Sequence, residues 1–289
     1  MHTQCILFPS TRKAFTLVEM MVVLVIISIL ASLSLAGLNV GRHRAKIDKT
    51  ASTIRKIDAV VQEMYSDYPT RSVLDDDLPR LMTFEMPDQW DDVQLSDTLG
   101  SLPRSLQTGA IRRYSRIATS ASVRTQLGDK LTNAECLYLC VARSGYEPDA
   151  IEQFRADEVG DLDSDGAKEF LDAWGKPIFF IRWAPGYSAA GAPGYLSPIQ
   201  MPAAPTASIR DKIESLVPLI YSAGPDEASN DTLTGPDGYA LQRPRRRGAP
   251  NTNPYDPILE FPDAGKPRTD VTDLNAYKDN ITNHQLMTR

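Results

Sequence analysis

Acidic residues at alternate positions make the stretch DLDSDG, residues 161–166, the clearest candidate for a binding site in the sequence. Calcium-binding loops place oxygen ligands with this spacing and then turn sharply at a glycine, which is Gly166 here. The ninth position of their twelve-residue pattern is Glu169. Ligands are expected at positions one, three, five, seven and twelve, which are Asp161, Asp163, Asp165, Ala167 (through its backbone carbonyl) and Asp172. The sequence therefore predicts a Ca²⁺ site, and the alternative is a solvated acidic turn.

A different carboxylate stands out because its neighbours are apolar. Glu19 is the only acidic residue between Phe15 and Leu38. An unpaired carboxylate at membrane depth costs at least about 2.5 kcal/mol, so such a residue is expected to have a partner. The other polar side chains of this stretch are one threonine and three serines, none of which is cationic. We therefore expect the partner of Glu19 to come from outside its own helix.

The sequence shows no group of closely spaced residues suited to catalysis or to nucleic-acid binding. The three histidines, His2, His43 and His284, are far apart, and the common motifs of serine hydrolases and phosphate-binding loops are missing. The formal net charge of −6 argues against a nucleic-acid binder held by overall charge. The arginines of QRPRRRGAP, residues 242–250, form one basic cluster, which we interpret as an exposed loop. We expect a protein that is not an enzyme.

The element that must position Glu19 is a long helix. The 24 residues from Phe15 to Leu38 would span roughly 36 Å at about 1.5 Å per residue, enough to cross a bilayer. This apolar run is too long for a cleaved secretory signal. Beyond it, apolar residues recur at helical spacing: Ile47, Ile54, Ile57, Val61 and Met64. We predict one helix that continues to about Tyr65, ends before Pro69, and lays its upper half on a globular domain.

The stretch KAFTLVEMMVVLVIISILA, residues 13–31, resembles the N-terminal segment of type IV pilins and type II secretion pseudopilins. In that family a prepilin peptidase cuts before a phenylalanine, the new amino terminus is N-methylated, and the fifth mature residue is a glutamate. The resemblance implies cleavage between Ala14 and Phe15, methylation of Phe15, and an assembly role for Glu19. It implies that Glu19 pairs with the terminal amine of a neighbouring subunit. Ala14 stands where the family usually has glycine.

The resemblance also implies where the protein acts and with which partners. It implies a single-pass protein of the bacterial inner membrane, with the C-terminal domain in the periplasm and later in a periplasmic or surface filament. The implied partners are copies of itself, other pilin-like subunits, the prepilin peptidase, and an inner-membrane platform with its assembly ATPase. Counting charges gives the opposite orientation, because lysine and arginine are concentrated after the apolar run. We follow the motif.

Periodicity and composition divide the remaining chain into short elements. We predict loops and short helices over 69–107, a helix over 120–143, and strands over 178–183 and 216–221. The helix over 120–143 would bury Cys136 and Cys140. Two cysteines one helical turn apart are poorly aimed at each other for a disulfide, so we predict two buried thiols.

The two predicted strands carry a second resemblance. In major pseudopilins, a strand with a W-G-x-P motif is followed by a strand that ends in a calcium-binding Ser-x-G-x-D loop. This chain has WGKP at 174–177 and SAGPD at 222–226. The resemblance implies a second Ca²⁺ site with carboxylates from Asp226 and Asp231. The alternative is a hairpin turn rich in Gly, Pro and Asp.

These observations predict an α+β, pilin-like fold, in which a long N-terminal helix packs on a small antiparallel sheet with long loops and inserted helices. The predicted parts are a cleaved leader, a transmembrane half-helix, an amphipathic half-helix and a globular domain, at 1–14, 15–38, 39–66 and 67–289. The predicted function is that of a structural subunit of a pseudopilus or pilus. The first alternative is a minor or tip pilin that acts as an adhesive or binds DNA through Arg243 to Arg247. A simple anchored periplasmic protein is the second.

Overall fold

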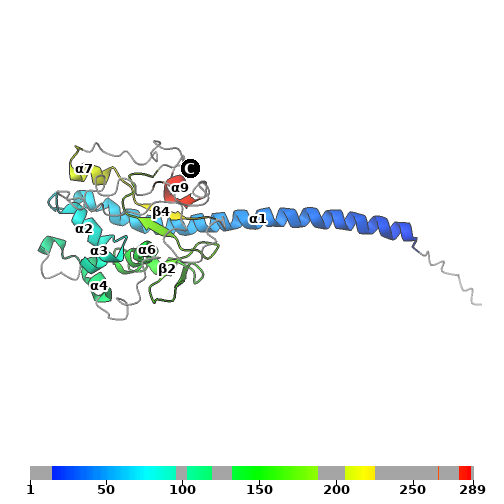
Figure 1. Cartoon of the computed structure of the whole chain (residues 1–289), viewed down its shortest axis with the longest axis horizontal. Helices are drawn as coiled ribbons and strands as arrows, with labels where there is room; N and C mark the ends of the chain where they lie inside the picture. The colour runs from blue at the N-terminus through cyan, green and yellow to red at the C-terminus, as the bar shows by residue number, and fades with distance from the viewer. Residues whose placement is uncertain are drawn as a thin grey trace, which may run out of the picture. The chain divides into compact units, whose positions relative to one another are not determined.

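The computed structural model describes residues 15–95, 103–118, 132–187, 206–224, 266 and 280–287 (Figure 1). By its internal contacts the chain forms two compact units, Met1–Ala45 and Lys46–Arg289. Helix α1, Leu17–Ser66, contributes residues to both units. The described residues also form short antiparallel sheets and further helices. The predicted α+β, pilin-like class is therefore confirmed.

The N-terminal half of α1 is apolar on all sides. Among the described residues, α1 is the one helix that is long and apolar enough to cross a membrane. Its large hydrophobic side chains from Leu17 to Val40 are all exposed within this chain. A helix that is apolar all round needs an apolar environment, which a bilayer or the helices of other chains can supply.

The C-terminal half of α1 packs into the core of the second unit. Ile54, Ile57, Val61 and Met64 are each 0% exposed, as the helical spacing predicts. The helix ends at Ser66 and a 3₁₀ turn follows at Tyr68–Thr70, with a proline in its first turn. The predicted end of the helix is thus confirmed.

Polar side chains on the same half of α1 hold the segments that precede two of the strands. Thr53 Oγ1 donates to Glu158 Oε1 at 2.6 Å, and Lys56 Nζ forms an ion pair with Glu158 Oε2 at 2.9 Å. Thr50 Oγ1 accepts a hydrogen bond from the backbone N–H of Ala173 at 3.0 Å. Burial of an apolar stripe and these polar contacts together hold the C-terminal half of α1 within the second unit.

The larger sheet has the strand order β3-β4-β5, with antiparallel pairs throughout. Its strands are β3, Phe179–Ile181, β4, Leu219–Ser222, and β5, Ile281–Thr282. The strand predicted over 178–183 is confirmed. The strand predicted over 216–221 starts later than expected, because residues before it follow helix α7, Ile209–Glu214, and include Pro218, which has no N–H for a ladder.

A smaller sheet pairs β1, Val159–Gly160, with β2, Glu169–Phe170, and the acidic loop connects these two strands. Helix α6, Thr132–Arg143, packs against both β2 and β3. The second half of the helix predicted over 120–143 is confirmed, and residues 120–131 lie outside the described residues. Cys136 and Cys140 are free, buried thiols, as predicted.

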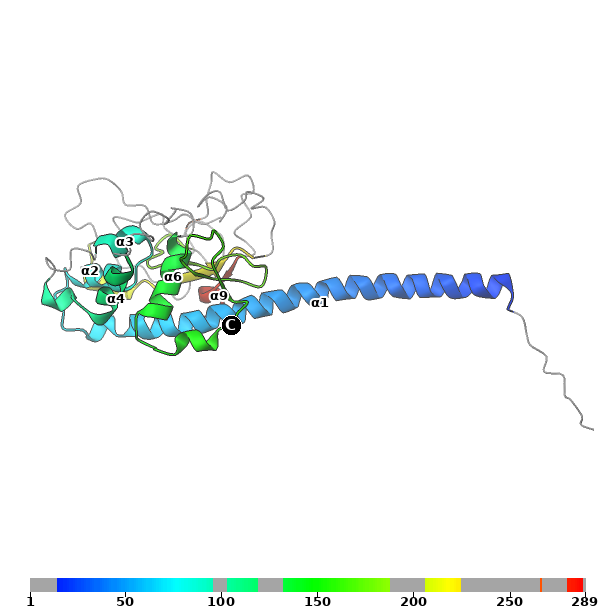
Figure 2. The same ribbon diagram turned by 90° about the horizontal axis from the view of Figure 1, so that it is seen from below.

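Helices α2, α3 and α4 lie side by side in Figures 1 and 2 and contact one another. Their bounds are Leu78–Glu85, Trp90–Leu95 and Gly109–Ala118. The first two confirm the short helices predicted over 69–107, and their apolar side chains form part of the core, since Leu78, Leu81 and Val93 are fully buried. Helix α4 was not predicted. The last helix, α9, spans Asn283–Met287 and contacts β4 and β5.

A buried ionic group joins the α2–α3 region to the larger sheet. Arg182, which follows β3, is 2% exposed. Its guanidinium lies 3.2 Å from Asp92 and 3.5 Å from Asp88, and it donates to the carbonyl of Met86 at 2.7 Å. A buried cation with two anionic partners and a carbonyl satisfies the requirement that buried charges be paired.

Candidate functional site

The first candidate site is the N-terminal end of α1, where Thr16 and Glu19 bind each other. The Thr16 backbone N–H donates to Glu19 Oε2 at 2.8 Å, and the Thr16 hydroxyl donates to the same oxygen at 3.0 Å. The Glu19 backbone N–H lies 3.2 Å from Thr16 Oγ1 and donates to it. Because α1 begins at Leu17, Thr16 is the N-cap and Glu19 is the third helical residue. This is a reciprocal capping box, which satisfies two backbone N–H groups at the helix start.

Glu19 thus has a hydrogen-bond partner at the start of its own helix, contrary to expectation, while the cationic partner expected from outside the helix stays a prediction. The sequence signal for the local partner was present, since Thr16 and Glu19 have the T-x-x-E spacing of a capping box. Thr16 is neutral, however, so these hydrogen bonds leave the negative charge of Glu19 in place. If the surface around Glu19 is buried in lipid or protein, a cation is still needed.

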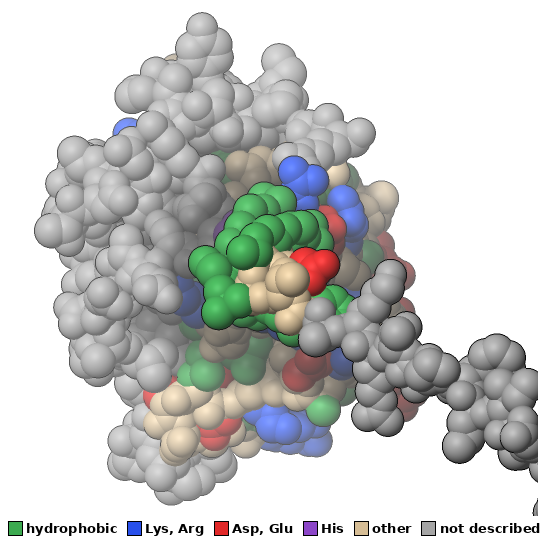
Figure 3. All heavy atoms as spheres, turned by 90° about the vertical axis from the view of Figure 1, so that its right-hand side faces the viewer, with side chains coloured by type: hydrophobic (Ala, Val, Ile, Leu, Met, Phe, Trp, Pro, Cys, Tyr) green, Lys and Arg blue, Asp and Glu red, His purple; other side chains and the backbone are tan. Residues whose placement is uncertain are grey.

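Apolar side chains surround this carboxylate. Phe15 is 77% exposed and Leu17 is 76% exposed in the isolated chain. Figure 3 shows hydrophobic side chains around the end of α1 that faces the viewer. Ala14, on the other side of the predicted cleavage point, lies outside the described residues.

The second candidate site is the acidic loop between β1 and β2. The carboxylates of Asp161, Asp163 and Asp165 have ligand oxygens within 4.8 Å of one another, so the loop gathers these three residues as the spacing predicts. Gly166 has a φ of +96° and makes the predicted sharp turn, and its N–H donates to Asp161 Oδ2 at 3.1 Å. The N–H of Ala167 donates to Asp165 Oδ1 at 2.7 Å. Two of the three carboxylates thus also hold the turn.

Asp172 does not join this loop, and its predicted role as the twelfth ligand is wrong. Its Oδ1 accepts from the backbone N–H groups of Trp174, at 2.8 Å, and Lys176, at 2.9 Å. Its Oδ2 accepts from Ser222 Oγ at 2.7 Å, and that hydroxyl accepts from Gly224 N–H at 3.1 Å. Asp172 is buried and holds the WGKP turn to the end of β4 instead. Burial raises the pKa of Asp172, while its hydrogen bonds oppose that change.

The other predicted calcium ligands, Asp226 and Asp231, lie outside the described residues, as do Arg243 to Arg247. The described part of the S-x-G segment ends at Gly224, which has a φ of +77°. The structure therefore joins the WGKP and S-x-G motifs through Asp172 and Ser222, and the second Ca²⁺ site stays a prediction.

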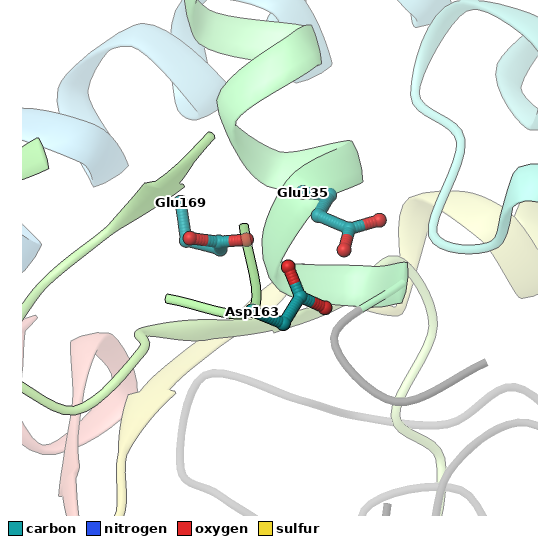
Figure 4. Close-up of side chains that lie close together, drawn as sticks. All are labelled: Glu135, Asp163 and Glu169. Carbon is teal, nitrogen blue, oxygen red and sulfur yellow. The ribbon is translucent and has the colours of Figure 1, made fainter. Parts of the chain in front are cut away.

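A further acidic group shares Asp163 with the loop and was not predicted. Glu135 from α6, Asp163 from the loop and Glu169 from β2 face one another in Figure 4, and their ligand oxygens lie within 4.8 Å of one another. Glu135 is 1% exposed and Glu169 is 0% exposed. In the sequence, Glu135 is recognisable only as a charged residue next to the predicted buried face of its helix. Its approach to Glu169 depends on the packing of α6 on β2.

Electrostatics in this group disfavour three free negative charges. Burial, together with the charges of Glu135, Asp163 and Asp161, raises the pKa of Glu169 to about 8, although the hydrogen bond from the Leu162 N–H lowers it. Burial also raises the pKa of Asp165, with Asp163 and Asp161 contributing. Carboxylates held this close either retain protons or bind a cation. Both acidic groups offer the oxygen ligands that hard divalent cations bind.

The comparison with known proteins bears on the first candidate site, the N-terminal end of α1. Residues 9–35 match the family model described as the prokaryotic N-terminal methylation motif. The chain carries a prepilin-type N-terminal segment. The matched residues include Ala14, Phe15 and Glu19, and the segment is typical of type IV pilin-like and pseudopilin-like precursors. No curated protein and no solved structure matches the chain. The similarity of residues 174–226 to major pseudopilins stays a prediction.

Proposed function

We propose that the protein is a structural prepilin-like subunit of a type IV pilus or a type II secretion pseudopilus. A prepilin peptidase cuts it between Ala14 and Phe15, Phe15 is methylated, and subunits assemble by packing the N-terminal halves of their α1 helices. The observation that carries the proposal is the methylation motif on a helix that is apolar all round and holds one carboxylate at its start. The motif also implies the inner-membrane platform and the assembly ATPase as partners.

The exposed apolar half of α1 is buried in two different environments, one before assembly and one after it. Before assembly a bilayer covers it, because its length and composition suit a membrane span. After assembly the same surface packs against α1 helices of neighbouring subunits, which are equally apolar. Transfer from lipid to a helix bundle gains little hydrophobic energy, so close packing and specific polar contacts must favour the filament.

Glu19 is proposed to supply such a contact. Its capping box survives cleavage before Phe15, because the Thr16 N–H belongs to the peptide bond between Phe15 and Thr16. Cleavage creates a cationic amine on Phe15 beside this helix start. Of the two carboxylate oxygens of Glu19, Thr16 donates to Oε2. We propose that Oε1 accepts from the Phe15 amine of a neighbouring subunit. Each buried charge is costly alone and tolerable when matched, so the pair sets the register between subunits.

The two roles of Glu19 can be separated with a matched pair of variants. Glu19→Gln keeps the capping box, since glutamine also serves at that position, but removes the charge. Thr16→Ala keeps the charge of Glu19 but removes the helix cap, which should cost about 1 kcal/mol of helix stability. We expect Glu19→Gln to enter the membrane and fail to assemble, and Thr16→Ala to assemble.

Assembly is measured as the fraction of the protein recovered in sheared filaments, or as cross-links between neighbouring subunits, after both variants are shown to accumulate in the membrane to equal levels. Normal assembly of Glu19→Gln would mean that Glu19 serves only as a helix cap. The proposed pairing would then be withdrawn.

A minor or tip subunit is the second candidate. It is favoured by the size of the unit Lys46–Arg289, which adds several helices to the sheets and the upper half of α1. Such a large globular part must be accommodated on a filament surface or at its end. Quantitative mass spectrometry of filaments decides between the candidates: a main subunit is the most abundant protein, whereas a tip subunit is present in a few copies.

A further inference from the structure

We propose that Glu135, Asp163 and Glu169 bind a Ca²⁺ ion inside the globular unit. The ion would join α6 to the loop and strand of the β1–β2 hairpin. This site lies between three elements and differs from the loop site that the sequence predicts, although it shares Asp163 with it. The inference does not depend on the proposed role in a filament.

The geometry of the three carboxylates suits one ion. Ca²⁺ binds oxygen at about 2.3–2.6 Å, so two ligands on opposite sides of one ion are about 4.6–5.2 Å apart. The ligand oxygens of Glu135, Asp163 and Glu169 lie within 4.8 Å of one another. A Ca²⁺ ion can therefore contact all three with little movement. Mg²⁺ demands a stricter octahedron and usually keeps several bound waters, so a site of three protein carboxylates, two of them buried, favours Ca²⁺.

Glu169 supplies a separate observation that points to a ligand. Its side chain is fully buried, and its Oε2 accepts from the backbone N–H of Leu162 at 3.2 Å. Its Oε1 is also buried and has no hydrogen-bond partner in the described structure. Buried polar atoms without a partner are uncommon and costly. In Figure 4 the carboxylate of Glu169 lies near those of Asp163 and Glu135. A cation bound among the three would satisfy the unpartnered oxygen of Glu169.

The other two carboxylates are placed for complementary tasks. Glu135 Oε2 accepts a hydrogen bond from the indole Nε1–H of Trp90, which fixes the orientation of a side chain that is 1% exposed. Asp163 is exposed and provides the access from solvent. A fixed inner pair with an exposed outer ligand lets an ion enter without unfolding of the hairpin.

The first test measures the melting temperature of the full chain in detergent micelles, in EDTA and in millimolar Ca²⁺. A ligand that binds only the folded state must raise its stability, so Ca²⁺ should raise the Tm of the wild type. Glu169→Gln and Glu135→Gln should abolish that rise. Asp161→Asn and Asp165→Asn should retain the rise in Tm, because neither residue is one of the three proposed ligands.

The glutamine variants keep the shape of each side chain and remove one repelling charge, so they should fold in EDTA at least as well as the wild type. Their response to Ca²⁺ is therefore informative. A wild type whose Tm does not respond to Ca²⁺ would overturn the proposal. A Ca²⁺ response that persists in Glu169→Gln, or that disappears in Asp165→Asn while persisting in Glu135→Gln, would overturn it as well.

The second test locates the ion with Tb³⁺, which replaces Ca²⁺ and emits when a nearby tryptophan is excited. Trp90 touches a proposed ligand, so tryptophan excitation should produce Tb³⁺ emission that excess Ca²⁺ removes. Trp90→Phe should abolish most of this emission, and the control Trp174→Phe should retain it. Emission that is unchanged in Trp90→Phe would place the ion elsewhere.

Discussion

Without a bound cation, the stability of the globular unit should fall as the pH rises, and Glu169 should cause much of that fall. Its pKa is raised by burial from 4.5 to about 8 in the folded chain. Between these values the unfolded chain has lost the Glu169 proton while the folded chain retains it. The unfolded state then binds fewer protons, so the free energy of unfolding decreases with pH. Below about pH 4.5 and above about pH 8 this contribution is constant.

The size of the effect follows from the pKa difference. One pH unit corresponds to about 1.36 kcal/mol, so the difference between 4.5 and about 8 gives roughly 5 kcal/mol for the whole interval. Glu169→Gln has no proton to lose and should avoid this loss. At pH 8.5 in EDTA the variant should therefore be more stable than the wild type, whereas at pH 5 the two should differ little.

Urea unfolding of the full chain in detergent, in EDTA at pH 5 and at pH 8.5, measures both free energies. The exposed Glu152 provides a matched control, since Glu152→Gln removes the same type of charge without burial and should follow the wild type. The reasoning is refuted if the wild type and Glu169→Gln lose the same free energy of unfolding between the two pH values. Glu169 would then not be a buried acid of raised pKa.

Two further predictions concern the buried groups that join the helices to the larger sheet. Arg182→Met should lower the free energy of unfolding by about 3–5 kcal/mol, because Asp88 and Asp92 would stay buried without their cation. Urea unfolding measures this loss. A loss below about 1 kcal/mol would contradict the buried ionic group. Burial raises the pKa values of Cys136 and Cys140, so neither thiol should react with a maleimide in the folded mature chain. Both thiols should react in urea. Rapid labelling of the folded chain would disprove their burial.

Local patterns predicted the parts of the fold that depend on neighbouring residues. The spacing of Ile54, Ile57, Val61 and Met64 gave the buried face of α1, because helical periodicity alone sets which residues share a face. The acidic loop formed as predicted for the same reason, since alternate aspartates and one glycine define its turn. The Thr16 and Glu19 capping box was equally local. The prediction of a partner from outside the helix rested on the charge of Glu19 alone, whereas the T-x-x-E spacing also indicates a neutral partner nearby.

Contacts between distant parts of the chain could not be predicted in this way. Glu135 and Glu169 meet because α6 packs on β2, and no spacing in the sequence indicates that contact. Asp172 fits the twelfth position of a calcium loop by number, but hydrogen bonds from the WGKP turn and from Ser222 direct it elsewhere. Spacing in the sequence thus indicates candidate ligands, and the packing of distant elements determines which carboxylates lie together.

The central claim is that the chain is a prepilin-like precursor processed at Phe15. It is tested most directly by a mass spectrum of the protein isolated from membranes of cells that contain the prepilin peptidase. We predict a mature chain that begins at Phe15 and carries a methyl group on its amino terminus. Because the family usually has glycine before the cut, Ala14→Gly should be processed at least as fully. A chain that retains its leader in both forms, or that is cut at another residue, would contradict the account.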